Sequence, residues 1–178
     1  MNYISLIEEL KKRGSVPGLD AIEGLLEELG HPEDNLKVVH IAGTNGKGSI
    51  FAYLSSILIA AGFKVGRYIS PTISCYEERF QINGEYIIKD KLARLYNIVE
   101  EAMKREEEKT GLKPTLFEVE TAISFLYFKE EKVDYALIEV GMVLCWVKLK
   151  ESLTEASREC WSWLCNATLC TCELSCKA

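Results

Sequence analysis

The feature that most constrains the fold is a glycine-rich loop at residues 43–49, Gly-Thr-Asn-Gly-Lys-Gly-Ser, which lies between two apolar stretches. The stretch before it, 37–42, is rich in β-branched residues and suits a buried strand. The stretch after it, 47–61, continues at helical spacing up to Gly62. A second β-branched run follows at 64–69. This strand–loop–helix–strand order predicts a parallel pair of strands joined by a crossover helix.

The same kinds of pattern extend over residues 1–142. Apolar periodicity predicts helices at 1–12, 19–29, 89–109 and 116–129, and a last buried strand at 135–140. Asn83-Gly84 separates two short strand-like runs, which predicts a β-hairpin because Asn and Gly accept the positive φ angles of a type I′ turn. We therefore predict an α/β domain, with a P-loop-type parallel sheet flanked by helices.

The composition changes abruptly near residue 142. All 12 glycines lie at or before Gly141, whereas all three tryptophans and every cysteine but Cys75 lie after it. We predict an ATP-binding domain over 1–142 and an atypical Cys- and Trp-rich tail over 143–178, which reflects a shifted reading frame or a misjoined gene. A metal site in the tail is the alternative, but its cysteines form no C-x-x-C pair and have no histidine nearby.

Charge and hydropathy exclude several classes of partner. The formal net charge of −6 argues against a nucleic-acid binder, which normally carries a basic face. Residues 1–13 alternate apolar and charged residues at helical spacing, unlike a signal peptide. The longest apolar-rich stretch, 50–63, is shorter than the roughly 20 residues that span a bilayer. We expect a cytoplasmic, monomeric protein with no nucleic-acid or membrane partner.

The loop at 43–49 has the chemistry of a phosphate site. A glycine-rich turn before a helix points backbone N–H groups inward and adds the positive end of the helix dipole. Lys47 can reach the terminal phosphates of a nucleotide, and the hydroxyl of Ser49 can help to hold Mg²⁺. The loop departs from the pattern G-x-x-x-x-G-K-[ST], because position 41 is Ile and Gly48 follows the lysine. A glycine-rich turn without a ligand is the structural alternative.

The loop and four later segments together resemble one family. The loop is the variant typical of the Mur ligase superfamily. The later segments are 68–71 (Tyr-Ile-Ser-Pro), 76–85, 117–121 (Phe-Glu-Val-Glu-Thr) and 138–141 (Ile-Glu-Val-Gly). Their order and spacing resemble folylpolyglutamate synthase and its bifunctional dihydrofolate synthase relatives over about residues 15–142. The resemblance implies an ATP-dependent ligase in which ATP phosphorylates a folate carboxylate and L-glutamate then attacks the acyl phosphate.

The resemblance also implies roles for individual residues. Those expected to cradle the phosphates of ATP are Gly43, Thr44, Asn45, Gly46, Lys47, Gly48 and Ser49, with Lys47 acting catalytically on the terminal phosphates. Those expected to ligate Mg²⁺ are Ser70 and Glu139. Those expected to line the folate site are Thr115, Phe117, Glu118 and Arg79.

Most of these residues also have a purely structural interpretation. Thr115 and Glu118 have the spacing of a helix capping box, and this role is compatible with substrate binding. Arg79 could instead form a surface salt bridge, and Glu139 could be a solvated acid at a strand end. His40 is interpreted as a packed core residue rather than a catalytic base.

The chain departs from the family pattern at several positions. Thr72 and Glu77 stand where the family has His and Asn, which bears on the shape of the folate loop. After residue 142 the family continues with a second glycine, further Mg²⁺-binding and catalytic residues and a C-terminal domain. We therefore expect a truncated copy without ligase activity. A non-catalytic nucleotide-binding remnant and another Mur-type amide ligase are the alternatives.

Overall fold

The computed structural model describes residues 3–14, 18–41 and 46–139. The predictions for Gly43, Thr44, Asn45 and the tail at 143–178 lie outside these ranges. Within them, one sheet has the strand order β1 (Val38–Ile41), β5 (Tyr135–Glu139), β2 (Val65–Tyr68), β3 (Phe80–Ile82) and β4 (Glu85–Tyr86). Strands β1, β5 and β2 are parallel, and β3 and β4 continue the sheet in antiparallel fashion.

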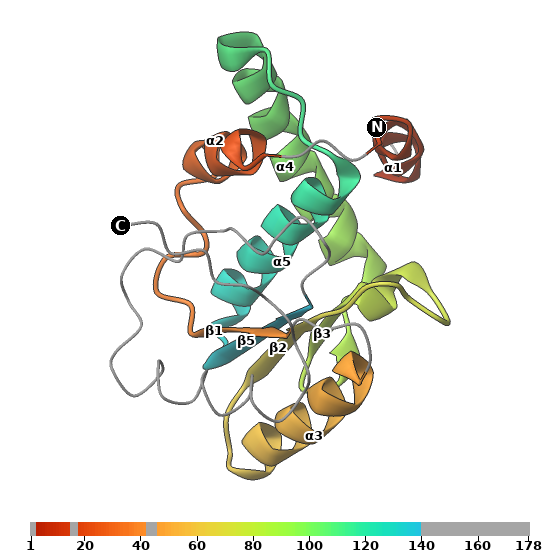
Figure 1. The fold of residues 1–178 in the computed structure, drawn as a ribbon, viewed down its shortest axis with the longest axis vertical. Helices are drawn as coiled ribbons and strands as arrows, with labels where there is room; N and C mark the ends of the chain where they lie inside the picture. The colour runs from red at the N-terminus through yellow and green to blue at the C-terminus, as the bar shows by residue number, and fades with distance from the viewer. Residues whose placement is uncertain (1–2, 15–17, 42–45, 140–178) are drawn as a thin grey trace.

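Helices cover both faces of this sheet, as Figure 1 shows. One face carries α3 (Lys47–Ala60). The other carries α1 (Tyr3–Lys11), α2 (Asp20–Glu28), α4 (Lys89–Thr110) and α5 (Leu116–Glu131). The prediction of an α/β fold with a sheet that contains parallel strands and is flanked by helices is confirmed. No helix within the described ranges is long and apolar enough to cross a membrane.

The alternation of side chains along the strands divides the interior into two cores. On β5, Ala136 and Ile138 point into a large core shared with α4 and α5, whereas Leu137 points into a smaller core with Phe51 of α3. Successive residues of a strand face opposite sides of a sheet, so a strand covered on both faces must be apolar throughout. The run Ala-Leu-Ile at 136–138 meets this requirement.

The parallel pair predicted at 37–42 and 64–69 is present, but its two strands are not neighbours. Strand β5 lies between them, with Val38 opposite Ala136 and Val65 opposite Tyr135. Strand β5, whose Ala136, Leu137 and Ile138 are all buried, thus takes an interior position with both of its faces covered. This order brings the carboxyl ends of three parallel strands to one edge of the sheet.

The predicted hairpin is confirmed. Asn83 and Gly84 both have positive φ angles, 51° and 87°, as a type I′ turn requires. The Asn83 side chain also accepts a hydrogen bond from the Val65 backbone at 2.8 Å, which fixes the turn against β2. Strand β4 is only 2 residues long and ends at Tyr86.

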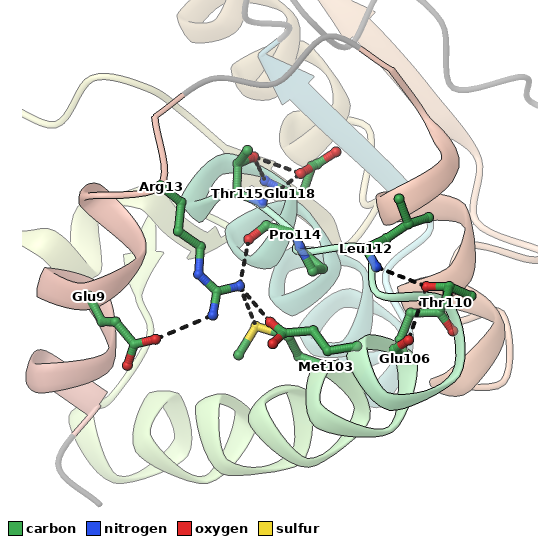
Figure 2. Close-up of polar contacts among 10 residues, drawn as sticks. Glu9, Arg13, Met103, Glu106, Thr110, Leu112, Pro114, Thr115 and Glu118 are labelled. Atoms are coloured by element: carbon green, nitrogen blue, oxygen red, sulfur yellow. Dashed lines mark hydrogen bonds and ion pairs between the residues drawn. The ribbon is translucent and has the colours of Figure 1, made fainter.

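Arg13 ties α1 to α4 and to the start of α5, as Figure 2 shows. Its Nη1 donates to Glu107 Oε1 at 2.6 Å and to the Pro114 carbonyl at 3.2 Å, and its Nη2 donates to Glu9 Oε1 at 3.3 Å. Charge-assisted bonds of this kind are about twice as strong as neutral ones. They hold the segment immediately before α5, the helix that carries Phe117 and Glu118 and is capped by Thr115.

Candidate functional site

The carboxyl ends of β1, β5 and β2 form the edge at which the predicted nucleotide residues gather. Ile41, the last residue of β1, pairs with Glu139, the last residue of β5. Tyr68 at the end of β2 pairs with Ile138, and Ser70 follows two residues later. Open α/β sheets bind ligands at this edge.

Glu139 joins two other predicted residues at this edge. Its Oε1 lies 3.7 Å from Lys47 Nζ, and its Oε2 accepts a hydrogen bond from the Ser70 backbone N–H at 3.0 Å. The side chains of Lys47 and Glu139 are 25% and 12% exposed. One carboxylate therefore links the first turn of α3 to the end of β2, and it places a cation and an anion side by side.

The start of α3 presents backbone donors at the same place. Gly46 precedes the helix with a left-handed φ of 80°, which glycine adopts without the steric cost of a side chain. The first helical hydrogen bond runs from Ile50 N to Gly46 O at 3.0 Å. The amides of Gly48 and Ser49 precede that bond and have no acceptor within the helix, so they are suited to an anion.

The predicted Mg²⁺ residues fit a partial ligand set. Glu139 and Ser70 together offer a carboxylate and a hydroxyl, which are hard oxygen donors of the kind that Mg²⁺ prefers. No group of three or more His, Cys, Asp or Glu side chains within the described residues could hold a metal ion. A cation here would therefore take its remaining ligands from phosphate oxygens and water, as Mg²⁺ commonly does.

Thr115 and Glu118 form the predicted capping box at the start of α5 (Figure 2). Glu118 Oε2 accepts from the Thr115 backbone N–H at 2.6 Å and from its hydroxyl at 2.7 Å. Both residues are buried. The structural interpretation is confirmed, and their contact with a substrate remains a prediction.

Arg79 does not form the surface salt bridge that was the alternative to substrate binding. It lies at the end of the short helix η1 (Tyr76–Arg79), where its Nη1 is 3.1 Å from Glu120 Oε2. The two side chains are only 13% and 3% exposed. The surface alternative is wrong because the Arg79 side chain is largely buried, and its carboxylate partner comes from α5.

Glu120 and Tyr68 are the residues that the sequence patterns missed. Glu120 lies one helical turn after Phe117 on α5, and the Tyr68 ring lies 6.1 Å from the ring of Phe117. The Tyr68 hydroxyl donates to Glu120 Oε2 at 3.4 Å. Two predicted folate residues, Arg79 and Phe117, thus meet around this pair. The available signal was an acid within the apolar run 119–128 with no local capping role.

His40 lies in β1 and is half-buried, so it is not part of the core that was predicted for it. Burial lowers the pKa of its imidazole, which favours the neutral form. Its strand neighbour is Ile138 of β5.

Glu120 is expected to give the free energy of unfolding a pH dependence of definite sign. Burial raises the pKa of Glu120 above the ordinary value of 4.5, while Arg79 and two tyrosine hydroxyls oppose the shift. A carboxyl group with a raised pKa in the folded state stabilises folding while it is protonated. That contribution is complete below the unfolded pKa and is lost as the pH rises through the folded pKa.

We therefore expect the free energy of unfolding of the parent, minus that of Glu120→Gln, to fall as the pH rises above 4.5, the ordinary pKa of a glutamate. Urea unfolding of both proteins at several pH values measures this difference. A difference that grows with pH would show that Arg79 outweighs the burial of the carboxyl group.

Comparison with known proteins places this geometry in a family. No family model matches the chain. The chain is 40% identical over 132 residues to the dihydrofolate synthase/folylpolyglutamate synthase of Bacillus subtilis, covering 74% of this chain and 31% of that protein. It matches the crystal structure of folylpolyglutamate synthase from Thermotoga maritima at 40% identity and a TM-score of 0.71, over 78% of this chain and 33% of that one. Over about three quarters of its length, the chain belongs to the folylpolyglutamate synthase/dihydrofolate synthase family.

The chain spans about a third of the length of the folylpolyglutamate synthases that it matches. Another match is a folylpolyglutamate synthase solved as a complex with AMPPCP and folate. It is 36% identical with a TM-score of 0.69, over 79% of this chain and 35% of that one. The predicted family and fold class are therefore confirmed for the part of the chain that aligns.

Proposed function

We propose that the described residues form the nucleotide-binding part of an ATP-dependent ligase that adds L-glutamate to a folate through an acyl phosphate. The observation that carries this proposal is the convergence of Lys47, Ser70 and Glu139 at the carboxyl edge of the parallel strands. Those residues come from three separate elements, and an α/β sheet binds its ligands at this edge.

In this proposal, the start of α3 binds the phosphates of ATP. The amides of Gly48 and Ser49 and the ammonium group of Lys47 supply donors and positive charge, which stabilise the charge that develops during phosphoryl transfer. Gly43, Thr44 and Asn45 complete the loop in the proposal, although they lie outside the described residues.

Glu139 and Ser70 would hold Mg²⁺ in the same site. The cation would neutralise negative charge on the phosphates and orient them, while these two residues fix its place. Bound Mg-ATP would also separate the ion pair seen between Lys47 and Glu139, because the phosphates compete for the lysine and the cation competes for the carboxylate.

The folate side of the proposal rests on α5 and η1. Phe117 offers an aromatic face, and Arg79 offers N–H donors to a carboxylate or a pterin. The charge of Arg79 is already balanced by Glu120. Its Nε is buried and has no hydrogen-bond partner among the described residues. The match to a complex with AMPPCP and folate supports this assignment.

We also propose that the 178-residue polypeptide by itself binds nucleotide without lengthening a folate, because it aligns with only about a third of the Bacillus subtilis and Thermotoga maritima proteins. A non-catalytic nucleotide-binding remnant is the alternative function, and it would share the phosphate site. The identity to folate enzymes favours a folate ligase over another Mur-type amide ligase.

Isothermal titration of the purified chain with AMPPCP, with Mg²⁺ and then with EDTA, tests the proposal. We expect saturable binding with one site per chain that weakens at least about tenfold when Mg²⁺ is removed, as expected when a charged ligand contact is lost. No saturable binding with Mg²⁺ present would overturn the nucleotide assignment. Lengthening of a folate in the presence of ATP and glutamate would overturn the proposal that this polypeptide is inactive.

A further inference from the structure

Residues 70–79, which lie between β2 and β3 and which we name segment 70–79, form a loop held mainly by polar contacts. The loop projects at the side of the molecule in Figure 1. The Ile69 N–H donates to the Arg79 carbonyl at 3.1 Å and closes its base. Glu78 Oε2 accepts from the amides of Ile73 and Ser74 at 2.9 and 2.8 Å. Ile73 itself is 94% exposed, so apolar burial does not hold the tip in place.

A carboxylate from another element anchors each end of segment 70–79. At the first end, Glu139 accepts from the Ser70 backbone. At the second end, Glu120 accepts from the Tyr76 hydroxyl at 2.5 Å and lies 3.1 Å from Arg79 Nη1. The first anchor belongs to the nucleotide edge, and the second belongs to α5 beside Phe117.

The second anchor is a buried polar cluster centred on Glu120. The Tyr68 hydroxyl donates to Oε2 at 3.4 Å, and the Tyr76 hydroxyl also contacts that of Tyr96 on α4. The Arg79 guanidinium lies 5.4 Å above the Tyr76 ring. A buried carboxylate is retained only where charges and donors satisfy it. Strand β2, η1 and α4 all supply donors to this cluster, with Glu120 of α5 at its centre.

We propose that Glu120 is the positioning residue of segment 70–79, holding Arg79 and Tyr76 in the orientation that the folate side of the site requires. This inference rests on the proposed function for its substrate. In the proposed folate site, Glu120 is buried and contacts no ligand, so it acts on the folate through Arg79. Its one carboxylate holds both the guanidinium group of Arg79 and the ring of Tyr76 through its hydroxyl. Removing the charge of Glu120 therefore releases both side chains together.

Two variants separate this role from simple packing. Glu120→Gln keeps the shape of the side chain but removes its charge, and Tyr76→Phe removes only one hydroxyl. Glu106→Gln is the matched control, since Glu106 is also a buried glutamate but lies on α4 facing Gly24 of α2. Hydrogen–deuterium exchange of the full 178-residue chain then reports local opening without any ligand.

In Glu120→Gln we expect the amides of Ile69, Ile73 and Ser74 to exchange at least about tenfold faster, since a hydrogen bond to a charged group is lost. The amides of β5 should be unchanged. Tyr76→Phe should give a smaller increase at the same amides, and Glu106→Gln should give none there. Unchanged exchange in segment 70–79, or a uniform increase over the whole chain, would overturn the proposal. If Glu120→Gln does not fold, Tyr76→Phe decides the question on the same criteria.

The affinities for folate and for Mg-AMPPCP provide a second test. A purely structural role of Glu120 would not change one of these affinities without the other. We expect Glu120→Gln to lower the affinity for folate at least about tenfold while changing the affinity for Mg-AMPPCP less than about twofold. Faster exchange with unchanged folate affinity would overturn positioning of the substrate side. If the parent binds no folate, the proposed function fails on its folate side, and so does the substrate role inferred for Glu120. The exchange result still decides whether Glu120 holds the segment.

Discussion

Replacing Lys47 with alanine is expected to lower the affinity of the chain for Mg-AMPPCP by about 10- to 100-fold, the range for loss of a charged hydrogen bond. Two effects act together. The phosphates lose an ammonium donor, and Glu139, which lies 3.7 Å from that ammonium in the parent, is left as an uncompensated negative charge beside them. Isothermal titration of parent and variant under the same Mg²⁺ concentration measures the change.

The matched control is Lys64→Ala. Lys64 is also paired with a glutamate, lying 2.8 Å from Glu131 Oε2, but it precedes β2 at the opposite end of the strand. Its removal should leave nucleotide affinity within about twofold of the parent, because exposed ion pairs at a distance are screened. Equal affinities for Lys47→Ala and the parent would show that α3 does not begin at a phosphate site.

Replacing Phe128 with alanine is expected to lower the free energy of unfolding by about 3–5 kcal/mol, as for other buried aromatic side chains. Phe128 is fully buried on α5, and its ring lies against the backbone of Gly66 in β2. A Cβ atom placed on Gly66 would approach Phe128 Cδ1 to 2.6 Å. The ring therefore fills the space that glycine leaves in an interior strand. Urea unfolding followed by circular dichroism measures the loss.

A double-mutant cycle tests the contact itself. Gly66→Ala alone should cost about 1–3 kcal/mol through overpacking, and much less when Phe128 is already alanine, because the clash is then gone. Residues in direct contact show such non-additivity, whereas distant ones do not. Additive losses in the two single variants would mean that Phe128 and Gly66 do not share this space.

The turn and the helix cap could be predicted because each depends on residues that are close together in the sequence. The positive φ angles at Asn83 and Gly84 and the capping box of Thr115 and Glu118 follow from residues within four positions of one another. Strand order was not predictable in this way. The insertion of β5 between β1 and β2 depends on pairing across about 70 to 100 residues, between Tyr135 and Val65 and between Ala136 and Val38.

The same difference between local signals and long-range pairing applies to the candidate site. Family resemblance identified Ser70 and Glu139, but their hydrogen bond exists only because β5 lies beside β2. Arg79 was open to interpretation as a surface residue because nothing in its own segment indicates burial. Its partner Glu120 lies 41 positions later on α5, and a pattern confined to either segment cannot pair them.

In the proposed function, a metal–nucleotide complex binds at the carboxyl ends of β1, β5 and β2. Mn²⁺ shares the oxygen ligands of Mg²⁺ and broadens the resonances of nearby nuclei. Amide spectra of the isotope-labelled chain with AMPPCP and Mn²⁺ therefore locate the metal. Because this broadening falls steeply with distance from the metal, we predict the strongest broadening at Lys47, Ser70 and Glu139 and weaker broadening at Tyr135, roughly 13 Å away along β5. Broadening centred on Val65 and Tyr135 at the opposite end of the strands, or none at saturating nucleotide, would contradict the claim.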